Sequence, residues 1–364
     1  PLAVILCDTP ETGNGVPAAL AGRYYNPRTP FQVEVSEGGA LSGCRTVQTH
    51  PVAGRLLDGH ARTAEEVDAE AGILVERAIS AGQDVLLIMS DQSKTGLLMP
   101  SPARAAQWKH RFGDRLEVFV DACQLRLCPE TLHAYVEQNF LVGLTGSKFV
   151  TGPAFSGALL VPPGLSGAWS QRELPASLAA YSACADWPKG WAGRESMTVP
   201  VNLGLLYRWQ AALTEMHLFH DLPRAAVASF FKDFGTALRE RLKRDPAFEP
   251  LDAGTLDRSG VAPGGGWDSE ATLFPFLPLK NGQPLDHADC RSLYQAVLER
   301  HGEIGQPTRC GSRQGVELGA LRLCAGMRTA TEALKPGGRG TNTVIGEALG
   351  LLDKVSDLSK EDRH

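Results

Sequence analysis

The sequence predicts an α/β protein: a large first part built on a mostly parallel sheet, followed by a smaller α+β domain. Up to about residue 160, short buried apolar runs alternate with amphipathic helical segments. This alternation is typical of parallel strands joined by right-handed helical crossovers. Beyond about residue 240, isolated strands lie between helices instead. We therefore expect a large domain at 1–240 and a small C-terminal domain at 241–364.

Composition indicates an ordinary soluble globular protein of 364 residues, with 43% hydrophobic residues and a net charge of -5. No apolar run reaches the roughly 18 residues that span a membrane, and the mild acidity argues against a nucleic-acid partner. Eight cysteines lie scattered without a CxxC pair, which predicts reduced cytoplasmic thiols and no metal site. The chain begins at Pro1 directly with a strand, so we expect an upstream segment to be missing.

The first part contains the strands and helices of the expected parallel sheet. Buried apolar runs predict strands at 2–6, 84–89, 116–120 and 140–144 and a glycine-containing strand before Pro162, and alternation predicts one more at 31–35. Helical periodicity predicts helices beginning near 16 and covering 64–80, 102–112, 129–138, 203–218 and 222–242. The stretch 162–193, rich in Pro, Gly and Trp, is expected to be irregular.

The small domain is expected to carry strands at 248–251, 271–279 and 320–324 and helices at 290–300 and 342–355. The glycine-rich stretch 254–268 is expected to be a mobile loop.

Polar side chains follow two of the buried strands. Asp121 ends one strand, and Lys148, flanked by Thr145 and Ser147, follows the next. Neighbouring parallel strands end at the same edge of a sheet, where ligands bind. Pyridoxal phosphate (PLP) needs such a pair, because a Lys amine forms a Schiff base with its aldehyde and an Asp keeps its ring nitrogen protonated. The pair therefore predicts a PLP site, with a surface lysine at a strand end as the alternative for Lys148.

The order Asp121-x-x-Gln124, then Lys148, then Gly152-Pro153 before a strand resembles the signature of the class V aminotransferases, a family of fold type I PLP-dependent enzymes. The resemblance implies a large domain with a mainly parallel seven-stranded sheet, a small C-terminal domain and an amino-acid substrate. It covers most of the chain.

By position, the resemblance implies that Lys148 is the Schiff-base lysine and Asp121 the partner of the pyridine nitrogen. Gln124 would donate a hydrogen bond to the phenolic oxygen of the cofactor. Thr145 and Ser147 stand where relatives contact the phosphate with Ser and His, and a hydroxyl can make the same contact.

Three further positions extend the implied cofactor site. Ser93 stands where many relatives have an Asn near the cofactor. Thr198, in a segment similar to the family's Glu-x-Gly-Thr-Pro-Asn, would reach the phosphate in the neighbouring subunit, which implies a homodimer with shared active sites; a helix N-cap is the alternative. The corresponding loop, 8–15, has neither the ring-stacking His of relatives nor an aromatic residue, and either Glu11 or Thr12 is expected at that position.

Arg322, in the segment 319–324, resembles the small-domain arginine that binds the substrate carboxylate, because a planar guanidinium suits a bidentate contact. A salt-bridged surface arginine is the alternative, and the competing candidates are Arg328, Arg309 and Arg313.

The broadest reaction that the resemblance implies is transamination, with Lys148 as the base. The alternative is a β-lyase of the cysteine desulfurase or kynureninase kind. Cys310 lies near the position of the desulfurase nucleophile, between Arg309 and Arg313, which would favour its thiolate. A loop thiol without a chemical role is the other interpretation of Cys310. A binding or regulatory module that kept the fold is a third possibility, which Lys148 and Asp121 disfavour.

Overall fold

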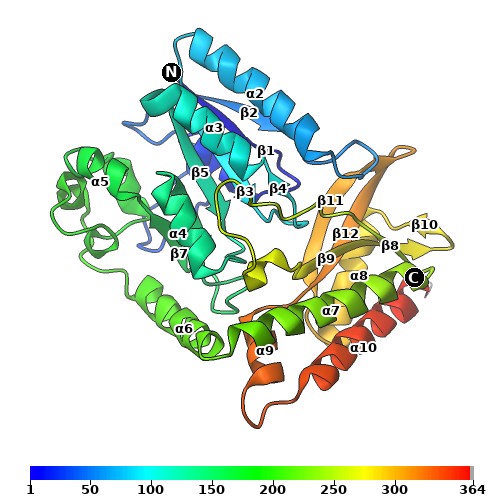
Figure 1. Cartoon of the computed structure of the whole chain (residues 1–364). Helices are drawn as coiled ribbons and strands as arrows, with labels where there is room; N and C mark the ends of the chain where they lie inside the picture. Colours follow the sequence, from blue (N-terminus) through cyan, green and yellow to red (C-terminus); the bar gives the residue numbers. More distant parts are fainter. Residues whose placement is uncertain (361–364) are drawn as a thin grey trace.

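The computed structural model describes residues 1–360, and its first sheet confirms the predicted α/β fold (Figure 1). The sheet has seven strands in the order β2-β1-β3-β5-β6-β7, with β4 beside β3. The strands from β2 to β6 are parallel, whereas β7 and β4 are antiparallel to their neighbours. Their bounds are β1 Leu2–Cys7, β2 Val47–Val52, β3 Asp84–Asp91, β4 Leu98–Met99, β5 Leu116–Ala122, β6 Leu141–Thr145 and β7 Gly157–Leu160.

Helices α2 (Ala64–Ser80), α3 (Pro102–Phe112) and α4 (Pro129–Glu137) join these strands. Their buried side chains form one core with alternate residues of β1, β3 and β5. The remaining alternate residues of β1 and β3 face the other side, where α1 (Val16–Leu20) contributes to a smaller cluster. The period-2 alternation of the strands therefore divides their apolar side chains between two layers.

The second sheet is antiparallel, with the order β10-β9-β12-β11 and β8 beside β9. Its strands are β8 Phe248–Pro250, β9 Leu273–Lys280, β10 Gln283–Pro284, β11 Gly305–Arg313 and β12 Val316–Cys324. The helices of this half of the chain are α6 Leu203–His220, α7 Arg224–Arg244, α8 His287–Arg300, α9 Met327–Leu334 and α10 Thr341–Lys360. A phenylalanine-rich core joins α7, α10 and β9 to Phe149, which follows β6. The boundary near residue 240 stays a prediction.

Three expectations about secondary structure were wrong. The stretch 31–35 alternates but forms no strand, because it is largely exposed and Gln32 adopts a positive φ of 58°. The stretch 162–193 contains helix α5 (Pro163–Ser170) and short 3₁₀ turns. The segment around Cys310 was expected to be a loop, but it is strand β11.

No helix within residues 1–360 is both long enough and apolar enough to cross a membrane. Within the same residues, no group of three or more His, Cys, Asp or Glu side chains is arranged to hold a metal ion.

Candidate active site

Asp121 lies near the end of β5, and the turn that carries Lys148 follows β6, the parallel neighbour of β5. In the register of β5 and β6, Asp121 lies opposite Gly143, so the two strands end at the same edge of the sheet. One carboxylate oxygen of Asp121, Oδ1, accepts a hydrogen bond from the Cys123 amide at 3.2 Å. Within residues 1–360, the other oxygen, Oδ2, accepts only a long hydrogen bond of 3.4 Å from the Thr12 hydroxyl. Oδ2 is therefore the oxygen that a stronger donor can engage.

The turn that carries Lys148 is held by its own backbone and hydroxyl groups. The Thr145 and Ser147 hydroxyls are 2.8 Å apart, and the Ser147 amide donates to Thr145 Oγ1. Gly146 packs so closely on α6 that a Cβ there would lie 2.5 Å from the Ala212 methyl group. The Lys148 amine itself makes no hydrogen bond or ion pair with any residue in 1–360. The turn is fixed, and the amine is left available.

Gln124, Ser147, Lys148 and Arg322 line one cavity of about 510 Å³ between the two sheets. Lys148, one of the lining residues, is exposed, so solvent reaches the cavity at this side chain. Arg328 lines the same cavity, so the sequence identified five side chains that the fold brings together from the turns after β5 and β6, from β12 and from α9. Asp121, Thr145, Ser93 and Thr198 are not among the lining residues.

Arg322 differs from the other arginine candidates in having no acidic partner within residues 1–360. It lies opposite Gly305 of β11, where a Cβ would come 2.3 Å from Arg322 Cγ, so only glycine leaves room for it. Its Nη1 donates to the Gln306 carbonyl at 2.8 Å. The three competitors each pair with a carboxylate: Arg309 with Glu317, Arg313 with Glu249 and Arg328 with Glu215.

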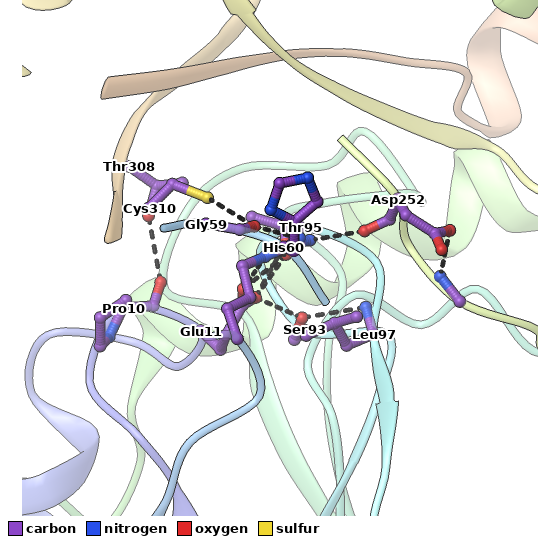
Figure 2. Close-up of polar contacts among 12 residues, drawn as sticks. Pro10, Glu11, Gly59, His60, Ser93, Thr95, Leu97, Asp252, Thr308 and Cys310 are labelled. Carbon is purple, nitrogen blue, oxygen red and sulfur yellow. Dashed lines mark hydrogen bonds and ion pairs between the residues drawn. The ribbon is translucent and has the colours of Figure 1, made fainter. Parts of the chain in front are cut away.

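Ser93 belongs to a buried polar network beside the site, which Figure 2 shows. Its hydroxyl donates to Glu11 Oε2 at 2.5 Å, and Glu11 Oε1 accepts from Arg55 Nε at 2.8 Å. The Thr95 hydroxyl lies 2.6 Å from both Glu11 Oε1 and Arg55 Nη2. Arg55 also donates to the backbone carbonyl of Asp252 at 2.9 Å. Ser93 thus fixes the glutamate instead of facing the cavity.

This network fixes the loop that carries Glu11 and Thr12, the two candidates for the residue that stacks on the cofactor ring. Both carboxylate oxygens of Glu11 already accept hydrogen bonds from buried groups, whereas the hydroxyl of the adjacent Thr12 donates to Asp121. Thr12 is therefore the residue of this loop that lies at the carboxylate of the site. Sequence patterns missed the network because Arg55 lies 44 residues from Glu11 in an irregular segment.

Lys94, which the sequence analysis also missed, lies near the cavity that Lys148 and Arg322 line. Burial lowers the pKa of its amine, and the positive charges of Arg322 and Lys148 lower it further. Its Nζ donates to Asn14 Oδ1 at 3.1 Å. The available signal was its position directly after Ser93, in the polar loop that ends a buried strand.

Cys310 is not the thiolate that its flanking arginines were expected to produce. Its side chain is buried on β11, and the Sγ donates to the Gly59 carbonyl at 3.8 Å. Burial raises the pKa of Cys310 to about 11, although the charge of Arg55 opposes that effect. The flanking Arg309 and Arg313 direct their guanidinium groups to glutamates instead.

Thr198 lies on the surface, shortly before α6. Exposed apolar side chains lie close to it in the chain and along α6, among them Val201, Leu203, Leu206 and Tyr207. Trp209 of the same helix donates to the Gly157 carbonyl, which places the helix against β7.

No protein-family model matches the chain, and no curated protein sequence matches it. Solved structures do match. The crystal structure of Oryza sativa TDC with PLP has a TM-score of 0.50 and 13% identity, over 99% of this chain and 61% of that one. The cystine C-S lyase C-DES in complex with cysteine persulfide has a TM-score of 0.50 and 17% identity, over 98% and 74%. This chain thus spans about three fifths of the length of the rice protein. These likenesses, with the seven-stranded sheet and the antiparallel second sheet, show that the chain has the fold of the fold type I PLP-dependent enzymes.

Proposed function

We propose that the protein is a PLP-dependent enzyme acting on an amino acid, with an active site of the class V aminotransferase kind. The observation that carries the proposal is the arrangement of Asp121 and Lys148 at neighbouring strand ends, beside a cavity that Arg322 also lines. The side chains fit the cofactor: within residues 1–360, the Lys148 amine has no hydrogen-bond partner, and Asp121 Oδ2 accepts only a long hydrogen bond from Thr12.

Each side chain has a physical role in this proposal. PLP, when bound, withdraws electrons from the α-carbon of the amino acid. The charge of Asp121 would keep the ring nitrogen protonated, and Gln124 would donate a hydrogen bond to the ring oxygen. The Lys148 amine would hold the cofactor by its aldehyde. One of the paired hydroxyls of Thr145 and Ser147 donates to the other, and the remaining O–H would donate to the phosphate.

The substrate end of the site is Arg322. Its guanidinium makes no ion pair within residues 1–360, and it lines the cavity together with Lys148. A bidentate contact with the α-carboxylate would orient the amino acid so that its α-carbon faces the lysine.

For the reaction we propose transamination, in which the Lys148 amine would act as the general base toward the α-proton of the amino acid. The amino group would pass to the cofactor and from there to a keto acid, so that the first substrate would leave as its own keto acid. The alternative is cleavage at the β-carbon. A desulfurase reaction is disfavoured, because the Cys310 thiol is buried and its raised pKa disfavours the nucleophilic thiolate. A panel of amino acids, assayed for keto acid and for sulfide or alanine release, separates the two reactions. Sulfide release that survives Cys310→Ala would exclude the Cys310 thiol as the nucleophile.

The first test of the proposal is covalent attachment of PLP. Addition of PLP should produce an absorbance band at about 420 nm, and borohydride reduction should leave the added mass on the peptide that contains Lys148. Lys148→Ala should abolish both signals, while Lys232→Met, which changes an exposed lysine on α7, should leave both intact. A band that survives Lys148→Ala would contradict the assignment.

A further inference from the structure

A second cavity of about 600 Å³ lies between the loops at the edge of the first sheet and the helix α8 and strand β11 of the second. Its walls are strongly basic. Three cationic side chains, Lys94, Arg291 and Arg309, line it beside His287, whose pKa is lowered by burial, and no Asp or Glu is among its lining residues. In a chain with a net charge of -5, a cavity with cations and no carboxylate is a local reversal of sign.

The cations of this cavity are largely free to meet a ligand. Lys94 donates to the neutral amide of Asn14, and Arg291 makes no ion pair within residues 1–360. Arg309 does pair with Glu317, but both side chains are more than half exposed. Such exposed pairs stabilise a fold by little, so the Arg309 charge can also turn toward an anion.

The second cavity adjoins the candidate active site through Gln306. This residue lines both cavities, and its carbonyl accepts the hydrogen bond from Arg322. The two sites are also close electrostatically, because the charges of Arg322 and Lys148 both lower the pKa of Lys94. A molecule whose α-carboxylate lies at Arg322 therefore has a basic space beyond it, on the side of Lys94.

We propose that the amino-acid substrate carries a second anionic group on its side chain, which the second cavity binds through Lys94 and Arg291. This inference rests on the proposed function and adds the class of substrate. Arg322 and Lys94 would then bind opposite ends of one molecule. Neutral and basic amino acids would leave these cations without a partner, so they would be poor substrates.

The kinetic test compares acids with their amides: L-glutamate with L-glutamine and L-aspartate with L-asparagine, on the PLP-loaded protein. The acid should be preferred. Lys94→Met should lower kcat/KM for the acid roughly tenfold to a hundredfold, the effect of one lost charge-assisted hydrogen bond. The loss should be mainly in KM, and the amide should be nearly unaffected. Arg291→Gln should act in the same direction, and Lys232→Met should change neither substrate.

A binding test separates this inference from the proposed function. Calorimetry with succinate and glutarate, which lack an amine, should show tighter binding than with butyrate, and Lys94→Met should remove the difference. Equal binding of mono- and dicarboxylates, or a difference that survives Lys94→Met, would overturn the second anionic site even if PLP binds to Lys148. Failure of PLP to bind would overturn the proposed function and the role of this anion as part of a substrate, while the calorimetry would still decide whether the cavity binds a second carboxylate.

Discussion

At the scale of single residues, the Asp8 carboxyl is held in an unfavourable place at the end of β1. Its Oδ1 is buried and has no hydrogen-bond partner within residues 1–360. Burial and the neighbouring charge of Glu11 raise the pKa of Asp8 to about 6, from its ordinary value of 3.8. A raised acid pKa means that the folded state holds the proton more tightly than the unfolded state does.

The sign of the effect on stability follows from these two values. The Asp8 contribution becomes unfavourable as the pH rises from about 4 to about 6, and it stays so above that range. We therefore expect Asp8→Asn to raise the melting temperature at pH 7.5 and to give almost no gain below pH 4. Calorimetric melting at both pH values measures this. Asp233→Asn, at an exposed position on α7, is the control, and an equal gain at both pH values would show that the charge of Asp8 is not the cause.

At the scale of elements, the glycine-rich segment 254–268 is anchored to the first sheet. Arg258 donates to both carboxylate oxygens of Asp91, at 2.8 and 2.6 Å, and the Tyr135 hydroxyl donates to the same carboxylate at 2.6 Å. All three side chains are buried. The expected mobile loop is therefore fixed at Arg258 by a contact that joins it to the end of β3 and to α4.

Removing one charge of this buried pair should be costly, because the other charge is left without a partner. We expect Arg258→Met to lower the free energy of unfolding by about 3–5 kcal/mol and Tyr135→Phe to lower it by about 1–3 kcal/mol. Urea unfolding measures both. The double variant Asp91→Leu with Arg258→Met should recover part of the loss. A double variant less stable than Arg258→Met would contradict the pairing as the origin of the effect.

Local signals explain which elements could be predicted. Helix α2 begins where the Thr63–Glu66 capping box places it, and β5 and β6 are short buried apolar runs. Strand β11 was missed because Gly, Pro and exposed polar residues interrupt its alternation. The same limit holds at the site. Asp121 and Lys148 come shortly after predicted strands, so their positions could be inferred. Lys94 and Arg55 reach the site only through contacts with distant segments of the chain.

At the scale of the whole molecule, we propose a homodimer formed through the start of α6. Leu206 and Tyr207 are 48% and 63% exposed there, and Thr198 lies nearby in the chain. Contiguous exposed apolar side chains are typical of surfaces that bind another protein. A second copy at this face would bring Thr198 toward the neighbouring active site, as the family resemblance implies.

Sedimentation velocity tests the dimer. The double variant Leu206→Glu with Tyr207→Glu should shift the protein to a monomer and weaken PLP binding, because each site would lose the partner's hydroxyl. Ile73→Glu, which changes a comparably exposed apolar residue on α2, should leave both the dimer and PLP binding unchanged. A dimer that persists in the double variant would place the interface elsewhere.

Arg55 holds parts of both halves of the molecule at one point. Its guanidinium bonds Glu11 and Thr95 at the edge of the first sheet, and it also bonds the carbonyl of Asp252, next to the second sheet. Other bonds join the same two halves: the Thr308 hydroxyl donates to the Pro10 carbonyl at 3.1 Å, and the Ser312 amide donates to the Leu57 carbonyl at 2.6 Å. Arg55 is therefore one of several ties between the halves, and its loss would weaken this interface without removing it.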